Sequence, residues 1–398
     1  MAFLPATRTG DAMRIMVVHN QYQQAGGEDT VCAAEIALLR SAGHHVIPLI
    51  FDNADIGGRL RAAQAALFTP YNPGSRRRVE RAIDEHAPDV VHVHNWFPLA
   101  SPSIFNACAA RRVPVVWTLH NFRVTCVNGF LFRDGRICED CLGRAPLPGI
   151  RHRCYRGSLA GSAVVAATDM LHGWLHTWSR KVDRLIALNA FARDKFVAAG
   201  LPAERLVVKP NFLPDPGPPS TGPRAGALFV GRLSPEKGVD VLVRAWSGLS
   251  TPLTIIGTGP ENERLRAMAG PNVTFVGHLG PAEVAERLRH TAMLIIPSLW
   301  YENFPMVLVE AFAHGVPALV SSGGALARIV TDSQDGWHFR MGDAADLARI
   351  ARQLVMQPET LTAAGQMARL HYETLLSPET NLRQLEAIYT AVCRERAA

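Results

Sequence analysis

Several features are missing from this 398-residue sequence, and their absence narrows its class. No apolar run approaches the roughly 18 to 20 residues that span a bilayer, and the first residues, MAFLPATRTGDAMRI, lack the apolar core of a secretory signal. Hydrophobic residues make up 48% and charged residues 19%, which argues against a disordered or fibrous chain. We therefore expect a cytoplasmic globular protein in which the residues before Met13 form a loose leader.

Sequence motifs for two classes of ligand, dinucleotides and nucleic acids, are also missing. No G-x-G-x-x-G fingerprint is present, which argues against a dehydrogenase that binds a dinucleotide. No nucleic-acid-binding motif and no internal repeat is evident either. Nucleic acid is therefore not expected among the partners.

Positive charge is concentrated in the first half of the chain. Of the 41 Lys and Arg residues 25 lie before residue 212, against 17 of the 35 Asp and Glu residues. Two arginine clusters contribute to this excess: Arg76, Arg77, Arg78 and Arg81 in the first, and Arg151, Arg153 and Arg156 in the second. They are either solvated faces or a contact for anionic lipid headgroups or an acceptor's phosphate, so an anionic membrane surface is one expected partner.

Short β-branched runs alternate with helical patterns, which predicts an α/β protein with two parallel sheets. The predicted strands are 13–20, 44–51, 89–95, 113–121, 183–189 and 206–211 in the first sheet, and 227–231, 252–259, 273–279, 292–298 and 316–322 in the second. The Pro- and Gly-rich stretch 212–226 reads as a semi-rigid linker. We expect a first domain over 13–211, a second over 227–377, and a terminal helical segment, 378–398.

The stretch PSLWYENFPMVLVEAFAHGVP places Glu302 in front of a predicted helix and Glu310 inside it. Pro305 suits the first helical position and Gly315 a stop, so we expect a helix over about 305–314. Its free N–H groups near Met306 to Leu308 can receive a diphosphate, with Glu310 within reach of a ribose diol. The alternative is an ordinary amphipathic helix with two solvated glutamates.

Upstream, ALFVGRLSPEKGVDVLVRAW reads as a strand, a loop and a helix, with Ser234 as N-cap and Pro235 as first helical residue. Arg232 and Lys237 flank the loop. A guanidinium and an ammonium at this place can neutralise a departing diphosphate, although two solvated surface cations give the same pattern.

Together these two stretches, a Gly-Gly at Gly26 and Gly27, and His120 at the end of a strand resemble the retaining family 4 (group 1) glycosyltransferases of polysaccharide and lipopolysaccharide assembly. The resemblance implies a GT-B fold, with two Rossmann-like domains facing each other across a cleft and the terminal helix crossing back to the first, acceptor-side domain. It further implies a hexosyltransferase-type enzyme that moves a sugar from a nucleotide diphosphate to a glycan or lipid-linked acceptor.

The resemblance also assigns site residues. Glu302, Arg232, Lys237 and His120, which is expected to contact the donor sugar, form the catalytic set. The donor-binding set is Gly26, Gly27, Arg232, Lys237, Asn303, Phe304, Met306, Val307, Leu308 and Glu310. Because the sequence has no D-x-D motif and Arg232 with Lys237 can replace Mg²⁺, no catalytic metal is expected. Trp300 and Tyr301 either shape the donor pocket or brace its loop.

An insertion at about 123–158 departs from the common family pattern because it gathers four cysteines: Cys126, Cys138, Cys141 and Cys154. Thiolates hold zinc tetrahedrally and C-x-x-C is a frequent half of such a site, so a structural zinc ion is expected here, with His152 as a substitute ligand. The alternative is four unconnected core thiols. The insertion would overhang the acceptor side of the cleft as a lid or an acceptor-binding element.

Met170, Trp174 and Trp178 recur every four residues, which predicts one apolar helix face. That face is either core packing or a landing site for a lipid carrier. Two further functions stay as alternatives: a nucleotide-sugar epimerase of GT-B fold, which would have no acceptor, and a catalytically silent protein that binds a sugar nucleotide.

Overall fold

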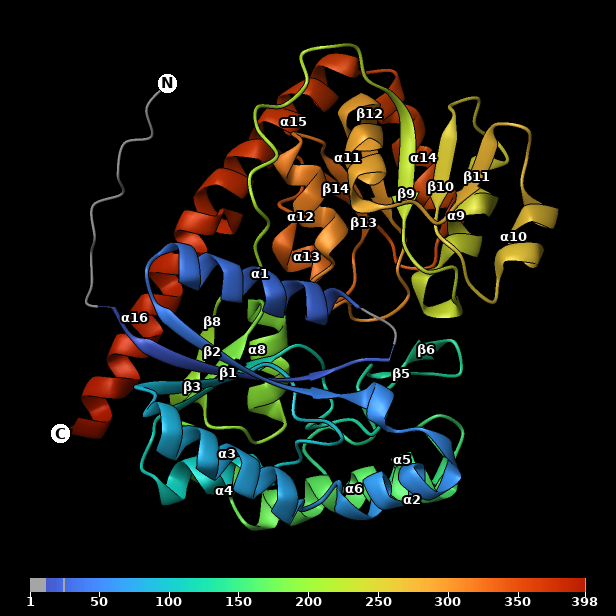
Figure 1. Ribbon diagram of the computed structural model, residues 1–398. Coiled ribbons are helices and arrows are strands. Elements are labelled where there is room, and N and C mark those ends of the chain that lie inside the picture. The colour runs from blue at the N-terminus through green and yellow to red at the C-terminus, as the bar shows by residue number, and fades with distance from the viewer. Residues whose placement is uncertain (1–11, 24–25, 398) are drawn as a thin grey trace.

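The computed structural model describes residues 12–23 and 26–397, so nearly all of the leader expected before Met13 lies outside the described residues. Two six-stranded parallel sheets dominate the molecule (Figure 1). The first sheet has the order β2-β1-β3-β4-β7-β8 and the second β11-β10-β9-β12-β13-β14. The expected α/β class with two parallel sheets is confirmed.

The first sheet contains β1 Arg14–Gln21, β2 His45–Asp52, β3 Val90–Val93, β4 Val115–Leu119, β7 Arg184–Ala187 and β8 Leu206–Val208. The second contains β9 Ala225–Val230, β10 Leu253–Ile256, β11 Val273–Gly277, β12 Thr291–Ile296, β13 Ala318–Ser321 and β14 Gly336–Phe339. Every predicted strand has an observed counterpart. The short strand β14 was not predicted, because its sequence GWHF lacks a β-branched run.

Helices cover both faces of each sheet (Figure 1). In the first half they are α1 Gly27–Ser41, α2 Gly58–Phe68, α3 Pro73–His86, α4 Ser103–Ala110, α5 Leu147–Arg151, α6 Leu159–Trp174, α7 Thr177–Arg180 and α8 Ala190–Ala198. In the second they are α9 Val239–Trp246, α10 Asn262–Met268, α11 Pro281–His290, α12 Met306–Ala313, α13 Leu326–Ile329, α14 Ala344–Val355 and α15 Pro358–His371.

The last helix, α16 Pro378–Ala397, runs back onto the first sheet (Figure 1). Side chains of β1 alternate between the two faces of this sheet: Met16 packs with α3 and α4, whereas Ile15 packs with α1 and α16. Leu385 and Tyr389 of α16 are fully buried in that second cluster. The core of the first half is therefore completed by residues that follow the whole second sheet in the chain.

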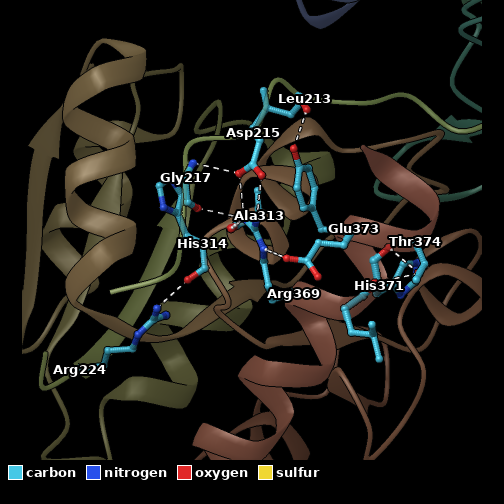
Figure 2. Close-up of polar contacts among 12 residues, drawn as sticks. Leu213, Asp215, Gly217, Arg224, Ala313, His314, Arg369, His371, Glu373 and Thr374 are labelled. Atoms are coloured by element: carbon cyan, nitrogen blue, oxygen red, sulfur yellow. Dashed lines mark hydrogen bonds and ion pairs between the residues drawn. The ribbon is translucent and has the colours of Figure 1, made fainter. Parts of the chain in front are cut away.

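The predicted linker 212–226 is tied closely to the second half (Figure 2). Arg369 donates two hydrogen bonds to the Asp215 carboxylate, at 3.0 and 2.8 Å. Arg224 donates to the carbonyl oxygens of His314 at 2.6 Å and Gly315 at 3.0 Å. The linker ends earlier than expected, because β9 already begins at Ala225.

The expected single apolar face of Met170, Trp174 and Trp178 is wrong. Helix α6 ends at Trp174, and His176 adopts a left-handed conformation with φ 52° that turns the chain before α7. Trp178 is therefore buried at 6% exposure, whereas Trp174 is 77% and Met170 46% exposed. Among the described residues, no helix is both long enough and apolar enough to cross a lipid bilayer.

Candidate functional site

The order of strands locates a site in each half. Ligands of open parallel sheets bind beyond the carboxyl ends of the strands, where connections leave to opposite sides. That point lies between β1 and β3 in the first sheet and between β9 and β12 in the second. The loops after β1, β9 and β12 carry Gly26–Gly27, Arg232–Lys237 and Glu302, and His120 directly follows β4, the neighbour of β3.

The loop after β9 is tighter than predicted. The expected helix from Pro235 is instead a single 3-10 turn, Pro235–Lys237, followed by Gly238 with φ 64°, and α9 begins only at Val239. A Cβ atom on Gly238 would lie 2.1 Å from the Pro297 carbonyl oxygen, so only glycine lets this loop approach the end of β12 so closely. Ser234 caps no backbone N–H, because its hydroxyl donates to the Glu236 carboxylate.

The two loops of the second sheet meet in an ion pair. Lys237 Nζ donates to Glu302 Oε1 at 2.7 Å, and the same oxygen accepts from Ser298 Oγ at 2.7 Å. Burial alone would raise the pKa of Glu302, but the Lys237 charge and these hydrogen bonds outweigh it and hold the pKa below its ordinary value. Glu302 is therefore an ionised carboxylate whose side chain is 6% exposed.

Arg232 is exposed and, among the described residues, forms no ion pair and no side-chain hydrogen bond. Its guanidinium thus keeps all its donors for a ligand. Lys237 also lies beside Trp300, with Nζ 5.2 Å from the centre of the indole ring. The structure brings Lys237 and Glu302 together, with Arg232 on the same loop as Lys237.

The helix that follows Glu302 starts one residue later than predicted. Pro305 is its N-cap rather than its first residue, and α12 covers Met306–Ala313. The N–H of Leu308 is not free, because a tight first turn pairs it with the Pro305 carbonyl at 3.0 Å. Within the described residues the N–H groups of Met306 and Val307 keep no such partner, so they are the free donors at this helix start.

Glu310 lies one helical turn further along α12 and is half-buried. Its carboxylate forms no hydrogen bond or ion pair with any described residue, and burial raises its pKa. A carboxylate held in this way is available to accept hydrogen bonds from hydroxyl groups. Phe304, by contrast, packs on the hydrophobic core of the second half.

On the opposite side of the cleft, Gly26 caps α1, and its N–H donates to the Asp29 side chain at 2.8 Å. Gly27 faces α12 directly, since a Cβ atom there would lie 3.8 Å from Met306 Cγ. The starts of α1 and α12 therefore face each other across the cleft.

His120 lies at the cleft end of a buried network of polar side chains that was not predicted from the sequence. Its Nε2 lies 3.0 Å from His94 Nδ1, and His94 Nε2 lies 3.3 Å from Glu35 Oε2. Glu35 Oε1 accepts from Lys209 Nζ at 2.6 Å. Burial holds the pKa of His120 well below its ordinary value, so the ring is neutral at neutral pH.

Glu35, His92 and His94 bring three ligand atoms within 4.8 Å of one another. His92, however, already uses both ring nitrogens, at 2.7 Å from Tyr389 Oη and 2.8 Å from Thr118 Oγ1. The Lys209 ammonium beside Glu35 would also repel a cation. These side chains fit a hydrogen-bond network better than a metal site.

Asn303 joins the two halves. Its Nδ2 donates to the Leu119 carbonyl at 3.0 Å, its carbonyl accepts from Asn189, and its Oδ1 is buried without a partner among the described residues. Beside it, the rings of Phe130 and Trp300 pack edge to face, with centroids 5.0 Å apart. The insertion thus contacts the loop that carries Glu302.

The insertion contains a short hairpin, β5 Phe132–Arg133 and β6 Arg136–Ile137, and α5. Its four cysteines, Cys126, Cys138, Cys141 and Cys154, are free thiols that line one small cavity. Among the described residues no three of their sulphur atoms lie within 4.8 Å of one another. His152 is exposed and does not line that cavity.

Comparisons with known proteins identify the family of this chain. Residues 219–371 match the family described as "Glycosyl transferases group 1", and residues 26–211 match the "Glycosyl transferase 4-like domain". The phosphatidyl-myo-inositol mannosyltransferase of Mycobacterium leprae is 30% identical over 97% of this chain and 100% of its own length.

Two solved structures share the GT-B fold of this chain. Sucrose-phosphate synthase from Thermosynechococcus elongatus has a TM-score of 0.70 at 16% identity, covering 96% of this chain and 99% of that one. HepE of Anabaena in complex with UDP has a TM-score of 0.67 at 17% identity, covering 94% of this chain and 99% of that one.

Proposed function

Because this chain belongs to the group 1 glycosyltransferases, we propose that it moves a sugar from a nucleotide-diphosphate sugar to an acceptor hydroxyl with retention of anomeric configuration. The observation that carries the proposal is the Lys237–Glu302 ion pair. It lies where the connections after β9 and β12 leave the sheet to opposite sides, next to the start of α12. An ammonium, free N–H groups and two carboxylates gathered there suit a diphosphate with a sugar on either side.

In this proposal Arg232, Lys237 and the N–H groups of Met306 and Val307 stabilise the charge that develops on the leaving diphosphate. Glu310 accepts from the ribose diol. Glu302 binds the hydroxyl groups of the sugar, which His120 contacts from the first half. Closure of the two halves brings donor and acceptor together, and no catalytic metal is needed.

The nucleotide donor is supported by the HepE structure, whose title states a complex with UDP. A thermal-shift panel of UDP, GDP and ADP tests the donor site, since a ligand that binds the folded state raises its melting temperature. We expect one nucleotide to raise it clearly. No shift at millimolar concentration would argue for a nonfunctional donor site.

Product analysis tests the reaction itself. We expect the anomeric coupling constants in proton NMR to show the same configuration in donor and product, together with release of the free nucleotide. A new nucleotide sugar without release would favour the epimerase alternative. Nucleotide binding without turnover on any acceptor would favour the silent binder.

The acceptor we propose is a lipid-linked glycan of cell-surface polysaccharide or lipopolysaccharide assembly, met at the inner face of the cytoplasmic membrane. Support comes from α2 and α6, which pack together and expose Leu60 (89%), Leu67 (74%) and Trp174 (77%). Arg151, Arg153 and Arg156, all exposed, precede α6. The first arginine cluster contributes less, because Arg76 pairs with Glu80 and Arg78 donates to the Ile50 carbonyl.

Vesicle sedimentation tests this surface. We expect the protein to pellet with phosphatidylglycerol vesicles and less with phosphatidylcholine vesicles, and a Leu60→Ser, Trp174→Ser variant to stay in solution. Equal sedimentation of variant and wild type would contradict the membrane face. Self-association of the wild type that the variant loses would indicate a second copy of the chain as the occupant.

We also propose that the four cysteines of the insertion hold a structural zinc ion. Four free thiols around one cavity support it, and the insertion, about 123–158, has little regular structure of its own. Ligation requires side-chain rotation, because sulphur atoms on one zinc lie about 3.8 Å apart. Metal analysis should find one zinc per chain, lost in Cys138→Ser. Purified protein without metal and with four freely titrating thiols would contradict this.

A further inference from the structure

A cavity of about 270 Å³ lies between the two halves of the molecule. Glu28 and Arg123 line it from the first half, Phe130 from the insertion, and Trp300 and Asn303 from the second half. His120 lines it as well, so the cavity opens beside the expected place of the donor sugar.

Arg123 has no acidic partner within hydrogen-bond or ion-pair distance among the residues that the structure describes. Its guanidinium carbon lies 4.4 Å from the centre of the Phe97 ring and 5.8 Å from that of Tyr155. Its Nη1 is buried and has no hydrogen-bond partner, and no carboxylate of the described residues lies within 4.0 Å of it. A buried N–H donor without an acceptor is costly, so this half-buried guanidinium favours an anion from outside the chain as its partner.

Two carboxyl groups, Glu28 and Asp169, act on Arg123 through space, but among the described residues neither forms an ion pair with it. Burial raises the pKa of Glu28 to about 8, although hydrogen bonds such as that from Tyr22 Oη at 2.8 Å and the Arg123 charge oppose the shift. Burial also raises the pKa of Asp169 well above its ordinary value, and both its oxygens lack a partner. Burial thus disfavours the charged form of both groups, and neither carboxyl forms a hydrogen bond or ion pair with the Arg123 guanidinium.

We infer that this cavity binds the acceptor substrate through an anionic group, a phosphate or a carboxylate, which the Arg123 guanidinium receives. The inference rests on the proposed function and adds a substrate class to it. A guanidinium matches either anion with two parallel hydrogen bonds. Asn303 lines the same cavity, and its buried Oδ1, which has no partner among the described residues, then accepts from a hydroxyl of the same ligand.

The walls of the cavity suit a sugar that carries this anion. Phe130 and Trp300 present aromatic surface, which covers the apolar face of a ring, while few polar groups fix its orientation. Protonated Glu28 donates its O–H to an oxygen of the ligand. The anion belongs either to a sugar phosphate or to a uronic acid residue.

Calorimetric titration of the full chain with glucose 1-phosphate, glucuronate and neutral glucose tests the inference. Saturating nucleotide diphosphate, chosen from the thermal-shift panel, blocks the donor site against free phosphate groups. We expect one of the two anionic sugars to bind at least tenfold more tightly than glucose, and the stronger one identifies the anion. Arg123→Gln should remove the preference. Arg144→Gln, an exposed arginine of the same insertion that does not line this cavity, should keep it.

Equal binding of anionic and neutral sugars, or an unchanged preference in Arg123→Gln, would overturn the inference. If Arg123→Gln does not fold, Arg123→Lys is the second variant. It retains the charge but not the two parallel hydrogen bonds, so it should keep only part of the preference, and an undiminished preference would overturn the inference likewise. Failure of every nucleotide to bind the wild type would count against the proposed function alone, because the sugar titrations are then run without nucleotide and still measure the preference.

Discussion

Two lysine–glutamate ion pairs with nearly the same distance between nitrogen and oxygen have different roles in this molecule. Lys209 and Glu35 are 2.6 Å apart with side-chain exposures of 0% and 2%, whereas Lys237 and Glu302 are 2.7 Å apart with 23% and 6%. Lys209 also donates to the Pro210 carbonyl at 3.3 Å, so two of its three N–H groups are used inside the protein. Lys237 has one such bond among the described residues. The first pair is closed to ligands, and the second keeps donors for one.

The chain has only four lysines against 37 arginines, and two of the four form these pairs. An ammonium is a compact point charge that fits where a planar guanidinium does not. Burial distinguishes the two pairs better than their length does. A short ion pair alone therefore does not identify a functional site.

Removing the buried lysine should have the largest effect. Lys209→Met leaves the Glu35 carboxylate buried without its counter-ion, which should lower the free energy of unfolding by about 3–5 kcal/mol in a urea titration. Lys195→Met is the matched control, because Lys195 and Glu139 are 21% and 34% exposed and should lose at most about 1 kcal/mol. Equal losses of unfolding free energy in both variants would contradict the distinction between buried and accessible ion pairs.

The accessible pair should matter for turnover rather than for folding. Lys237→Ala removes a donor to the leaving diphosphate, which should lower kcat/KM about 100- to 1000-fold, or about 3–4 kcal/mol. The melting temperature should fall much less than in Lys209→Met. Near-normal transfer with a correct fold would show that the ion pair is structural after all.

The two ion pairs should also differ in the pH at which their contribution to stability is lost. Because the folded-state pKa of Glu302 lies below its ordinary value of 4.5, its contribution to stability is complete above about pH 4.5 and is lost as the pH falls through the lower, folded-state pKa. The stability difference between wild type and Glu302→Gln should therefore shrink below pH 4.5. Glu35→Gln should keep its difference to lower pH, since the pKa of Glu35 is held well below ordinary by Lys209 and the histidines against the opposing effect of burial.

The smallest effect on turnover is expected from Phe130, which supports the Lys237–Glu302 pair indirectly through Trp300. Phe130→Ala removes an edge contact to Trp300, which lies beside Lys237, and aromatic pairs contribute about 0.5–1.5 kcal/mol. We expect KM for the donor or acceptor to rise less than about tenfold. Leu147→Ala, 57% exposed on the same insertion, should leave KM unchanged. A large fall in stability in Phe130→Ala would instead assign Phe130 to the core of the insertion.

Local patterns were sufficient to predict every strand of the two large sheets except β14. The β-branched runs predicted these strands, and Glu302 and Lys237, which remain proposed site residues, stood in short motifs that also predicted the start of α12 to within one residue. The details of the loop after β9 were wrong, because the contact of Gly238 with Pro297 depends on a strand some 60 residues away in the sequence. Sequence patterns describe neighbours along the chain better than neighbours in space.

The buried network of polar side chains shows the same limit. Glu35 lies on an ordinary amphipathic helix and Lys209 at the end of a strand, and only folding brings them together across 174 positions. Arg123 likewise reads as one more arginine in a basic half. Its lack of an acidic partner is a property of the folded cavity. A signal was available only in the alternation of His92, on β3, and His94, directly after it, which places both side chains on one side of the chain.

The position of α16 also affects the order in which the protein can be made. A ribosome releases β1 to β8 first, yet Leu385, Tyr389 and Val392, which cover one face of that sheet, are translated after the entire second half. The first half therefore cannot complete its folding and keeps apolar surface exposed while the second half folds as a unit. In a growing chain the late-made half is complete before the early-made one, and a nascent chain stalled before residue 385 should depend on chaperones to keep its first half from aggregating.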